Sequence, residues 1–426
     1  MNRPQEALLF LLREARASKP VSGLSDASPI RSISDISAEE WPLVVAEAHR
    51  HGLSPYLYFK FHSRPRPDEH APESVIPESA LAELRQAYLR NAMVNLQRFH
   101  YLEAALLALA AAGVPVIVLK GGYLAEAIYG NIALRVMSDL DILVKPADVS
   151  KSDSALRRAG FAPAENRVEA LADTNEFHFY HRKSGELVEL HVEPVDADYP
   201  FYMKTEDLWA AAVPARIAGV EAMSLSPEDL LIYQGIHAAL HSYGYGLRAF
   251  FDAAAIVDRL PVDWHVLIDR TRKFRAEKPV WMLLSLTRDL LGLLFPNEVL
   301  STLRPPDATQ AHLESAAKAV LKEDEGGPRR DGGNPKVILF FGRKGLLTKF
   351  SLVFHKAFPS WRKVAGLYDL SPYSPLVALH YPHCLWTRIK RFAPAIRAEV
   401  AARRKDAESA SRKDVASLMD WMMRSG

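Results

Sequence analysis

Two aspartates stand one residue apart at the head of an apolar run, in the stretch "SDLDILV" at Asp139 and Asp141. Residues i and i+2 of a strand point to the same side. The sequence therefore predicts that both carboxylates project together, while Leu140 and Ile142 are buried on the opposite face. Two carboxylates held this close repel each other. A divalent cation offsets that repulsion, and two Mg²⁺ or Mn²⁺ ions sharing a carboxylate are suited to phosphoryl chemistry.

A third carboxylate occurs in a matching context further along the chain. In "ELVELHVEP" the alternation places Val188 and Leu190 on the core face, with Glu189 and His191 on the other. An acid in the middle of a strand is costly unless it is paired or bound to a metal. We predict that Glu189 completes a three-carboxylate site, on a strand beside that of Asp139. His191 either supports a metal ligand or is simply hydrogen-bonded within its strand.

The stretch "VIVLKGGYLAEAIYG" offers what a nucleotide phosphate needs. Gly121 and Gly122 permit a tight strand-to-helix turn, with a phosphate close to the backbone N–H groups at the helix start. Lys120 adds a positive charge for a triphosphate. The stretch is not a Walker A sequence, and a Lys-Gly-Gly tripeptide also occurs in ordinary turns.

The elements that must position these residues form a compact α/β unit. "VPVIVLKGG" and "SDLDILVK" read as strands separated by a short helix, and Pro146 begins a further helix that Gly160 ends. "FHFYHRKSGELVELHVEP" predicts two strands joined by a hairpin through residues 183–185. Strand, helix, strand, helix and hairpin within about 80 residues indicate a small mixed sheet with helices packed on it.

Helical patterns flank this unit on both sides. A proline-rich loop over 64–78 precedes a long helix from Ser79 to Ala112, and Ser226 is the expected N-cap of a helix that starts at Pro227. Five regions are expected: a helical region 1–112, an α/β core 113–220, a helical region 221–321 completing the cleft, a linker 322–335, and a basic, mostly helical region 336–426.

Composition is that of an ordinary globular protein, with 426 residues of which 49% are hydrophobic. The single cysteine, Cys384, excludes an intrachain disulfide, and no apolar run approaches the roughly 20 residues of a transmembrane helix. Both observations favour the cytoplasm. The net charge of +2 divides unevenly, because residues 332–413 carry about +12 and the remainder about −10. The basic segment contacts a polyanion, either nucleic acid or anionic lipid, or packs against the acidic body.

The combination "LKGGYLAEAIYGNIALRVMSDLDILV", "VELHVEP" and "LSPEDLLIYQGIHAALH" resembles a bacterial family of uncharacterised nucleotidyltransferases. This family is a branch of the DNA polymerase β-like superfamily. The resemblance implies an α+β fold in which Asp139, Asp141 and Glu189 hold two Mg²⁺ or Mn²⁺ ions and Glu189 helps to deprotonate the attacking hydroxyl. It also places Arg135, with the Lys-Gly-Gly turn, among the nucleotide-binding positions.

The helical block downstream is expected to form a wall of the cleft. His237 and His241 are four residues apart, and the pair suits either zinc or, as we favour, packing and hydrogen bonding. Arg248 and Asp252 share the same spacing and can pair along a helix.

The leading hypothesis is a metal-dependent nucleotidyltransferase that transfers NMP from an NTP, with ATP the expected donor, and releases pyrophosphate. Its acceptor would be a hydroxyl on a small molecule, a peptide or RNA. The alternatives are a toxin-type enzyme that modifies RNA or tRNA, and a nucleotide-binding regulatory protein without turnover.

Overall fold

The computed structural model describes residues 1–16, 30–62, 76–163, 176–196, 199–244 and 246–321. Further along the chain it describes residues 364, 371, 373–383, 385–386, 390 and 410–424. The predicted linker 322–335, most of the predicted region 336–426 and most of the proline-rich loop 64–78 lie outside the described residues.

Seven strands of the described chain form one mixed sheet, in the order β3-β4-β5-β2-β1-β7-β6. The strands are β1 (Ile117–Val118), β2 (Leu140–Leu143), β3 (Phe161–Pro163), β4 (Glu176–His181), β5 (Leu187–His191), β6 (Val213–Ile217) and β7 (Val220–Ser224). Strand β2 runs parallel to β5 and antiparallel to β1, while β4 and β5 form the hairpin expected from the sequence. The expected α+β fold with a small mixed sheet is confirmed.

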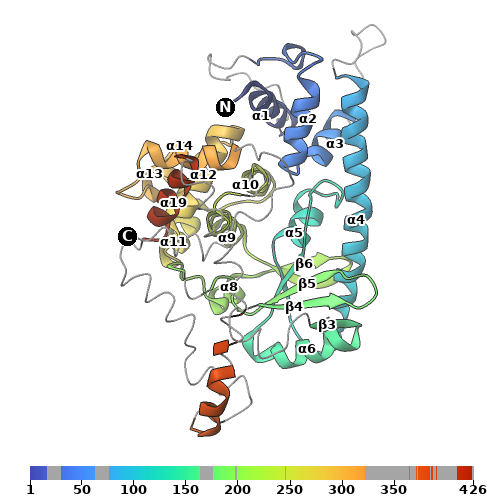
Figure 1. Ribbon diagram of the computed structural model, residues 1–426, viewed down its shortest axis with the longest axis vertical. Helices are drawn as coiled ribbons and strands as arrows, with labels where there is room; N and C mark the ends of the chain where they lie inside the picture. The colour runs from blue at the N-terminus through green and yellow to red at the C-terminus, as the bar shows by residue number, and fades with distance from the viewer. Residues whose placement is uncertain are drawn as a thin grey trace.

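Helices surround this sheet and extend well beyond it (Figure 1). Those before the sheet are α1 (Arg3–Arg16), η1 (Ile33–Asp35), α2 (Trp41–Arg50), α3 (Ser54–His62) and α4 (Glu78–Ala111). Those between its strands are α5 (Lys120–Tyr123), the π-helical turn η2 (Leu124–Ile128), η3 (Pro146–Asp148), α6 (Val149–Arg158) and α8 (Thr205–Ala211). Those after it are α9 (Pro227–Leu240), α10 (Arg248–Arg259), α11 (Trp264–Lys273), α12 (Glu277–Leu291), α13 (Asn297–Leu303), α14 (Gln310–Leu321) and α19 (Ala410–Met422).

Helix α4 links the N-terminal helices to the sheet, because it contacts α2 and α3 as well as α6 and β7. Its span confirms the long helix expected from the sequence. Helix α9 also begins as expected, since the Ser226 side chain accepts a hydrogen bond from the Asp229 amide and Pro227 is its first residue. Both helices contact the Lys-Gly-Gly segment, α4 through Leu102 beside Gly122 and α9 through Tyr233 beside Lys120.

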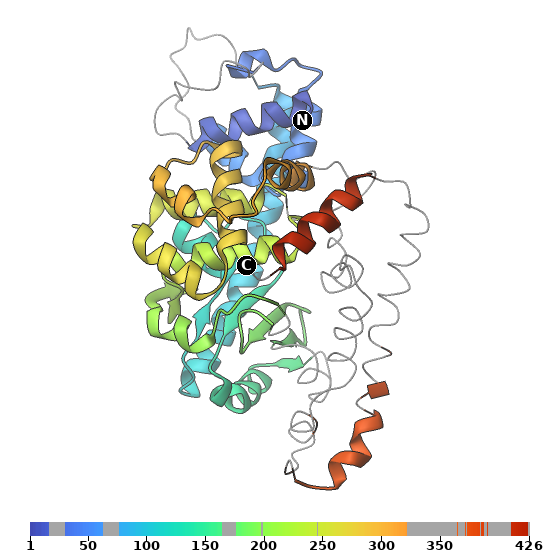
Figure 2. The ribbon, with the colours of Figure 1, turned by 90° about the vertical axis from the view of Figure 1, so that its left-hand side faces the viewer.

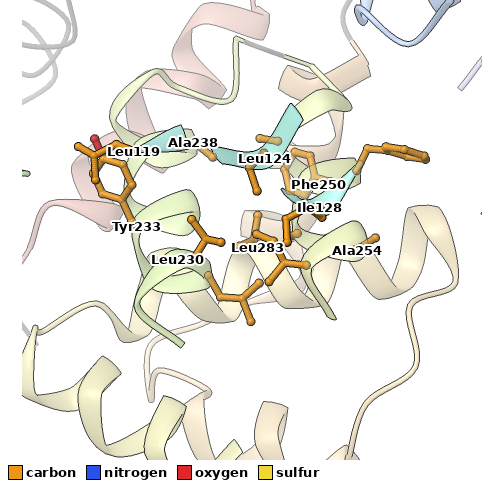
Figure 3. Close-up of a cluster of buried hydrophobic side chains, with 14 of the residues drawn as sticks. Leu119, Leu124, Ile128, Leu230, Tyr233, Ala238, Phe250, Ala254 and Leu283 are labelled. Carbon is orange, nitrogen blue, oxygen red and sulfur yellow. The ribbon is translucent and has the colours of Figure 1, made fainter. Parts of the chain in front are cut away.

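The segment that follows the Lys-Gly-Gly turn is anchored in the helical core. Figure 3 shows one buried cluster that joins η2 to the helices α9, α10 and α12; it includes Leu124, Ile128, Leu230, Ala254 and Leu283. Because η2 is held by apolar packing on the helical side, the turn before it has a fixed position relative to the sheet.

Helix α1 is hydrogen-bonded to α12, a helix far along the sequence. Arg13 donates from Nε to the Leu290 carbonyl (2.8 Å) and from Nη2 to that of Asp289 (2.9 Å). Arg16 donates to the Leu291 carbonyl (2.6 Å). These carbonyls lie at the C-terminal end of α12, where they have no partner within the helix. Helix α1 therefore caps α12.

The C-terminal helix α19 packs against α14, as Figure 2 shows for the dark red helix. Lys278 of α12 donates from Nζ to the carbonyls of Trp421 (3.0 Å) and Arg424 (3.1 Å), and His312 stacks on Trp421. Among the described residues, no helix is both long enough and apolar enough to cross a membrane.

Candidate metal and nucleotide site

Carboxylate and imidazole groups form a row across three neighbouring strands. In the register of the sheet, Asp141 of β2 lies beside Glu189 of β5, and Glu189 lies beside His178 of β4. Alternate residues of these strands point to the other face, where Leu140 and Val188 are buried. The sheet thus separates an apolar face from a face with several ionisable groups.

Asp141 is the most enclosed of these groups, with its side chain 1% exposed. Its Oδ1 accepts from Lys120 Nζ at 3.0 Å and lies 3.0 Å from His191 Nε2. Burial acts to raise the pKa of Asp141, but Lys120 and His191 outweigh it and hold that pKa below its usual range.

The pKa values of His191 and Lys120, the two cationic partners of Asp141, shift in the opposite direction to that of Asp141. Burial acts to lower the pKa of His191, yet its hydrogen bond to Asp141 raises that pKa to about 9. The pKa of Lys120 is also raised well above its usual value, because the nearby carboxylates outweigh its burial. In this structure both side chains are therefore positively charged at neutral pH and neutralise Asp141.

Asp139 lies just before β2 and faces the same group of charges. Burial raises its pKa to about 6, and repulsion from Asp141 acts in the same direction. The repulsion expected between the two aspartates is therefore present. A cation placed between them would remove it.

Sequence reasoning missed two residues of β4, Glu176 and His178. His178 Nε2 lies 3.3 Å from Glu176 Oε1 and 3.7 Å from Glu189 Oε1, and His191 Nδ1 lies 3.6 Å from Glu176 Oε2. The signal was available, because in "EFHFYH" Glu176 and His178 alternate with buried Phe177 and Phe179. The same i, i+2 argument that identified Asp141 would have found both residues.

Two groups of described side chains could each hold a metal ion. Within each group, the atoms that could bind the ion lie within 4.8 Å of one another. One consists of Asp141, Glu189 and His191, and the other of Glu176, His178 and Glu189. Oxygen and imidazole nitrogen atoms are common ligands of divalent cations. The donor set therefore fits a metal site, although Asp139 belongs to neither group.

The Lys-Gly-Gly turn differs in detail from the expectation. Lys120 itself adopts the left-handed backbone conformation (φ 40°), whereas Gly121 and Gly122 do not. The glycines are instead needed for close packing. A Cβ on Gly121 would lie 2.8 Å from Arg135 Nη1 and 2.9 Å from Met137 Sδ, and one on Gly122 would lie 3.0 Å from a Val118 methyl carbon.

Arg135 is held by a buried ion pair. It donates from Nε and Nη2 to the two carboxylate oxygens of Asp252, at 3.0 and 2.8 Å. Tyr129 and Gln234 also donate to Asp252, at 2.7 and 3.1 Å. Arg248, four residues before Asp252, donates to the Val136 carbonyl at 3.4 Å. Arg135 and Asp252 thus connect the loop before β2 to helix α10.

The two histidines of the helical block, His237 and His241, lie close together at the C-terminal end of α9. The rings of His237 and His241 are 4.5 Å apart between centroids. Burial lowers the pKa of His237 well below its usual value, and the charge of Lys120 contributes. Tyr233 of α9, which sequence reasoning also missed, places its ring 5.7 Å from Lys120 Nζ. Lys120 and Arg248 are thus both close enough to His237 to act on its pKa.

Helix α4 fixes the loop that leads to Asp139. Asn91 donates to the Ala133 carbonyl (2.7 Å), Asn95 to the carbonyls of Ile132 and Arg135, and Arg98 to that of Met137. Asn91, Asn95 and Arg98 are spaced by four and three residues, so they lie along one face of the helix. The helix therefore positions the loop through its backbone.

A cavity of about 280 Å³ lies on the α4 side of this loop. Its lining includes His49, Arg90, Asn91, Arg98, Val136 and Met137. None of the carboxylates of the sheet contributes to it, so the cavity is distinct from the candidate metal site.

A model of the family described as "Uncharacterised nucleotidyltransferase" matches residues 37–292, which is more than half of the chain. The chain belongs to this nucleotidyltransferase family. No curated protein matches it. A solved structure, "Solution Structure of Antibiotic-Resistance Factor ANT(2'')-Ia Reveals Substrate-Regulated Conformation Dynamics", is similar at 15% identity, covering 42% of this chain and 93% of that chain with a TM-score of 0.32.

Every candidate residue of this nucleotidyltransferase, from Lys120 to Asp252, falls within the matched residues. The structure brings Lys120, Asp141, Glu189 and His191 together, with Asp139 beside them. Arg135 lies against the Lys-Gly-Gly turn, with Nη1 beside Gly121, while its Nε and Nη2 pair with Asp252. The candidate site is thus centred on β2 and β5.

Proposed function

We propose that this nucleotidyltransferase transfers NMP from an NTP, with ATP the expected donor, to an acceptor hydroxyl and releases pyrophosphate. Divalent cations, Mg²⁺ or Mn²⁺ and two in number, would be held by Asp139, Asp141 and Glu189. The observation that carries the proposal is the pairing of Asp141 with Glu189 across β2 and β5, in a chain of this family. When bound, the cations would neutralise charge on the phosphates and polarise the oxygens bonded to phosphorus.

Each protein group has a role in this reaction. Glu189, half-buried on β5, accepts the proton of the acceptor hydroxyl, whose oxygen then forms a bond to the α-phosphorus. The bond from that phosphorus to the oxygen of the β-phosphate breaks, and pyrophosphate leaves. Lys120, which pairs with Asp141 in this structure, would bind phosphate oxygens of the NTP with the same ammonium group. Positioning and electrostatics account for most of the rate enhancement.

The test is pyrophosphate release from each NTP with a panel of hydroxyl acceptors. We expect Asp139→Asn combined with Asp141→Asn to lower kcat at least 100-fold, because removing one charge-stabilising group commonly costs about 10²- to 10³-fold. Asp153→Asn on α6 is the matched control, since Asp153 is half-buried away from the site and pairs with Arg157 one helical turn away. Undiminished activity in the double variant would contradict the assignment of Asp139 and Asp141 as metal ligands.

The acceptor class needs its own assay. RNA is favoured only by the basic segment 332–413, most of which lies outside the described residues. Transfer of label from an NTP to total RNA, compared with peptide and small-molecule fractions, separates the RNA-modifying alternative from the others. Tight nucleotide binding with no labelled product in any fraction would instead favour the regulatory alternative.

A further inference from the structure

The two oxygens of Glu189 face different partners. Oε2 lies 3.7 Å from His191 Nε2, on the side of Asp141. Oε1 lies 3.7 Å from His178 Nε2, on the side of β4. A carboxylate whose oxygens face two separate groups of donors has the arrangement of one that bridges two cations.

The group on β4 has the composition and spacing of a metal site. His178 Nε2 stands 3.3 Å from Glu176 Oε1 and 3.7 Å from Glu189 Oε1. The contact between His178 and Glu176 is a long hydrogen bond, whereas the 3.7 Å between His178 and Glu189 exceeds the usual hydrogen-bond distance of about 2.9 Å. Metal–ligand bonds of about 2.1 Å place neighbouring ligands of a tetrahedral ion about 3.4 Å apart. The donors are therefore spaced as ligands around one small cation.

We propose that Glu176, His178 and Glu189 bind a divalent transition-metal cation on β4, at a site separate from that of Asp139 and Asp141. An imidazole ligand with two carboxylates suits Mn²⁺ or Zn²⁺, whereas Mg²⁺ takes oxygen ligands almost exclusively. The site deepens the proposed function in one respect, since Glu189 is shared with it. The binding of the cation does not itself require turnover.

The surroundings of the site are consistent with a bound ion. The side chains of Glu176, His178 and Glu189 are 31%, 22% and 16% exposed, so three protein ligands leave room for water or a phosphate oxygen. Glu176 presents its second oxygen to His191 Nδ1 at 3.6 Å, where it orients the ring whose Nε2 faces Asp141. Glu176 therefore links the two groups of donors, because one of its oxygens faces His178 and the other faces His191.

The alternative is a network of ion pairs in which the imidazoles only balance the carboxylates. Metal-binding measurements on the full chain distinguish a metal site from an ion-pair network. Calorimetry measures the binding of Mn²⁺ and Zn²⁺, and electron paramagnetic resonance measures the Mn²⁺ that stays free. We expect His178→Gln and Glu176→Gln each to bind one ion fewer, or to bind it at least about 10-fold more weakly than the unaltered chain. His181→Gln, on the same strand but outside the group, is the matched control and keeps the full number.

Thermal unfolding of each variant establishes that it is folded. The proposal is overturned if both folded variants bind Mn²⁺ and Zn²⁺ with unchanged number and affinity. It is equally overturned if Asp139→Asn with Asp141→Asn removes every bound ion. Failure of the proposed function has a different signature, because the chain would then bind the β4 ion and release no pyrophosphate with any acceptor.

Discussion

Lys120 shows how one residue combines strain with charge. Its left-handed backbone conformation costs about 1–2 kcal/mol for a residue with a Cβ, and glycine follows it immediately. The side chain meanwhile contacts both Asp141 and the ring of Tyr233. Strained residues of this kind concentrate at functional sites, which agrees with a role for Lys120 in nucleotide binding.

Gly121 offers a test of how closely the turn is packed. We expect Gly121→Ala to lower the free energy of unfolding by about 1–3 kcal/mol, because the new methyl group would overlap Arg135 and Met137. Activity should fall further than stability alone explains, since Met137 lies two residues before Asp139. Denaturant unfolding and steady-state kinetics measure the two effects. Ala104→Gly, at a half-buried position within α4, is the comparison: it should cost about 1 kcal/mol through helix propensity and leave kcat unchanged.

At the scale of elements, the hydrogen bonds of α4 to the loop before β2 are the feature that positions Asp139. We expect Asn95→Ala to lower the free energy of unfolding by about 1–3 kcal/mol, because the carbonyls of Ile132 and Arg135 lose their donor. The value of kcat should fall as the loop shifts. Met93→Ala on the exposed side of α4 is the control and should change stability by no more than about 0.5 kcal/mol. A less stable Asn95 variant with unchanged kcat would show that α4 does not set the position of Asp139.

The sequence predicted those elements whose local pattern was strong. Alternation in "SDLDILV" and "ELVELHVEP" identified β2 and β5, and Ser226-Pro227 marked the start of α9. It did not reveal the ion pair between Arg135 and Asp252, because their pairing depends on how the loop meets α10. Spacing suggested Arg248 as a partner for Asp252, whereas a partner 117 positions away leaves no local signal.

The carboxylate site was predictable only in part for a similar reason. Asp141 and Glu189 lie in neighbouring strands because β2 pairs with β5, as the matching alternation of the two stretches predicted. Alternation in "EFHFYH" indicates that Glu176 and His178 share one face of β4, but which residues of β5 they lie beside is set by the register of the hairpin. The metal-binding roles of these residues, and the domain boundaries, stay predictions.

At the scale of the whole molecule, α19 is held to α12 through Lys278. We expect Lys278→Met to lower the free energy of unfolding by about 1–3 kcal/mol, because the carbonyls of Trp421 and Arg424 lose a buried donor. Release of α19 is measured as faster proteolysis within residues 410–424. Lys273→Met is the control, since its ion pair with Asp207 is exposed and contributes at most about 1 kcal/mol. Equal proteolysis in both variants would show that Lys278 does not hold α19 in place.

The capping of α12 by α1 has a consequence for the order of synthesis. Arg13 and Arg16 leave the ribosome 275 to 277 residues before Asp289, Leu290 and Leu291 do. At about 5–20 residues per second, roughly 15–60 s separate the two. During that interval α1, whose buried residues include Leu8 and Leu12, lacks its contacts with α12. Before α12 is synthesised, α1 can already pack against α2 and α3, which it also contacts in the folded chain.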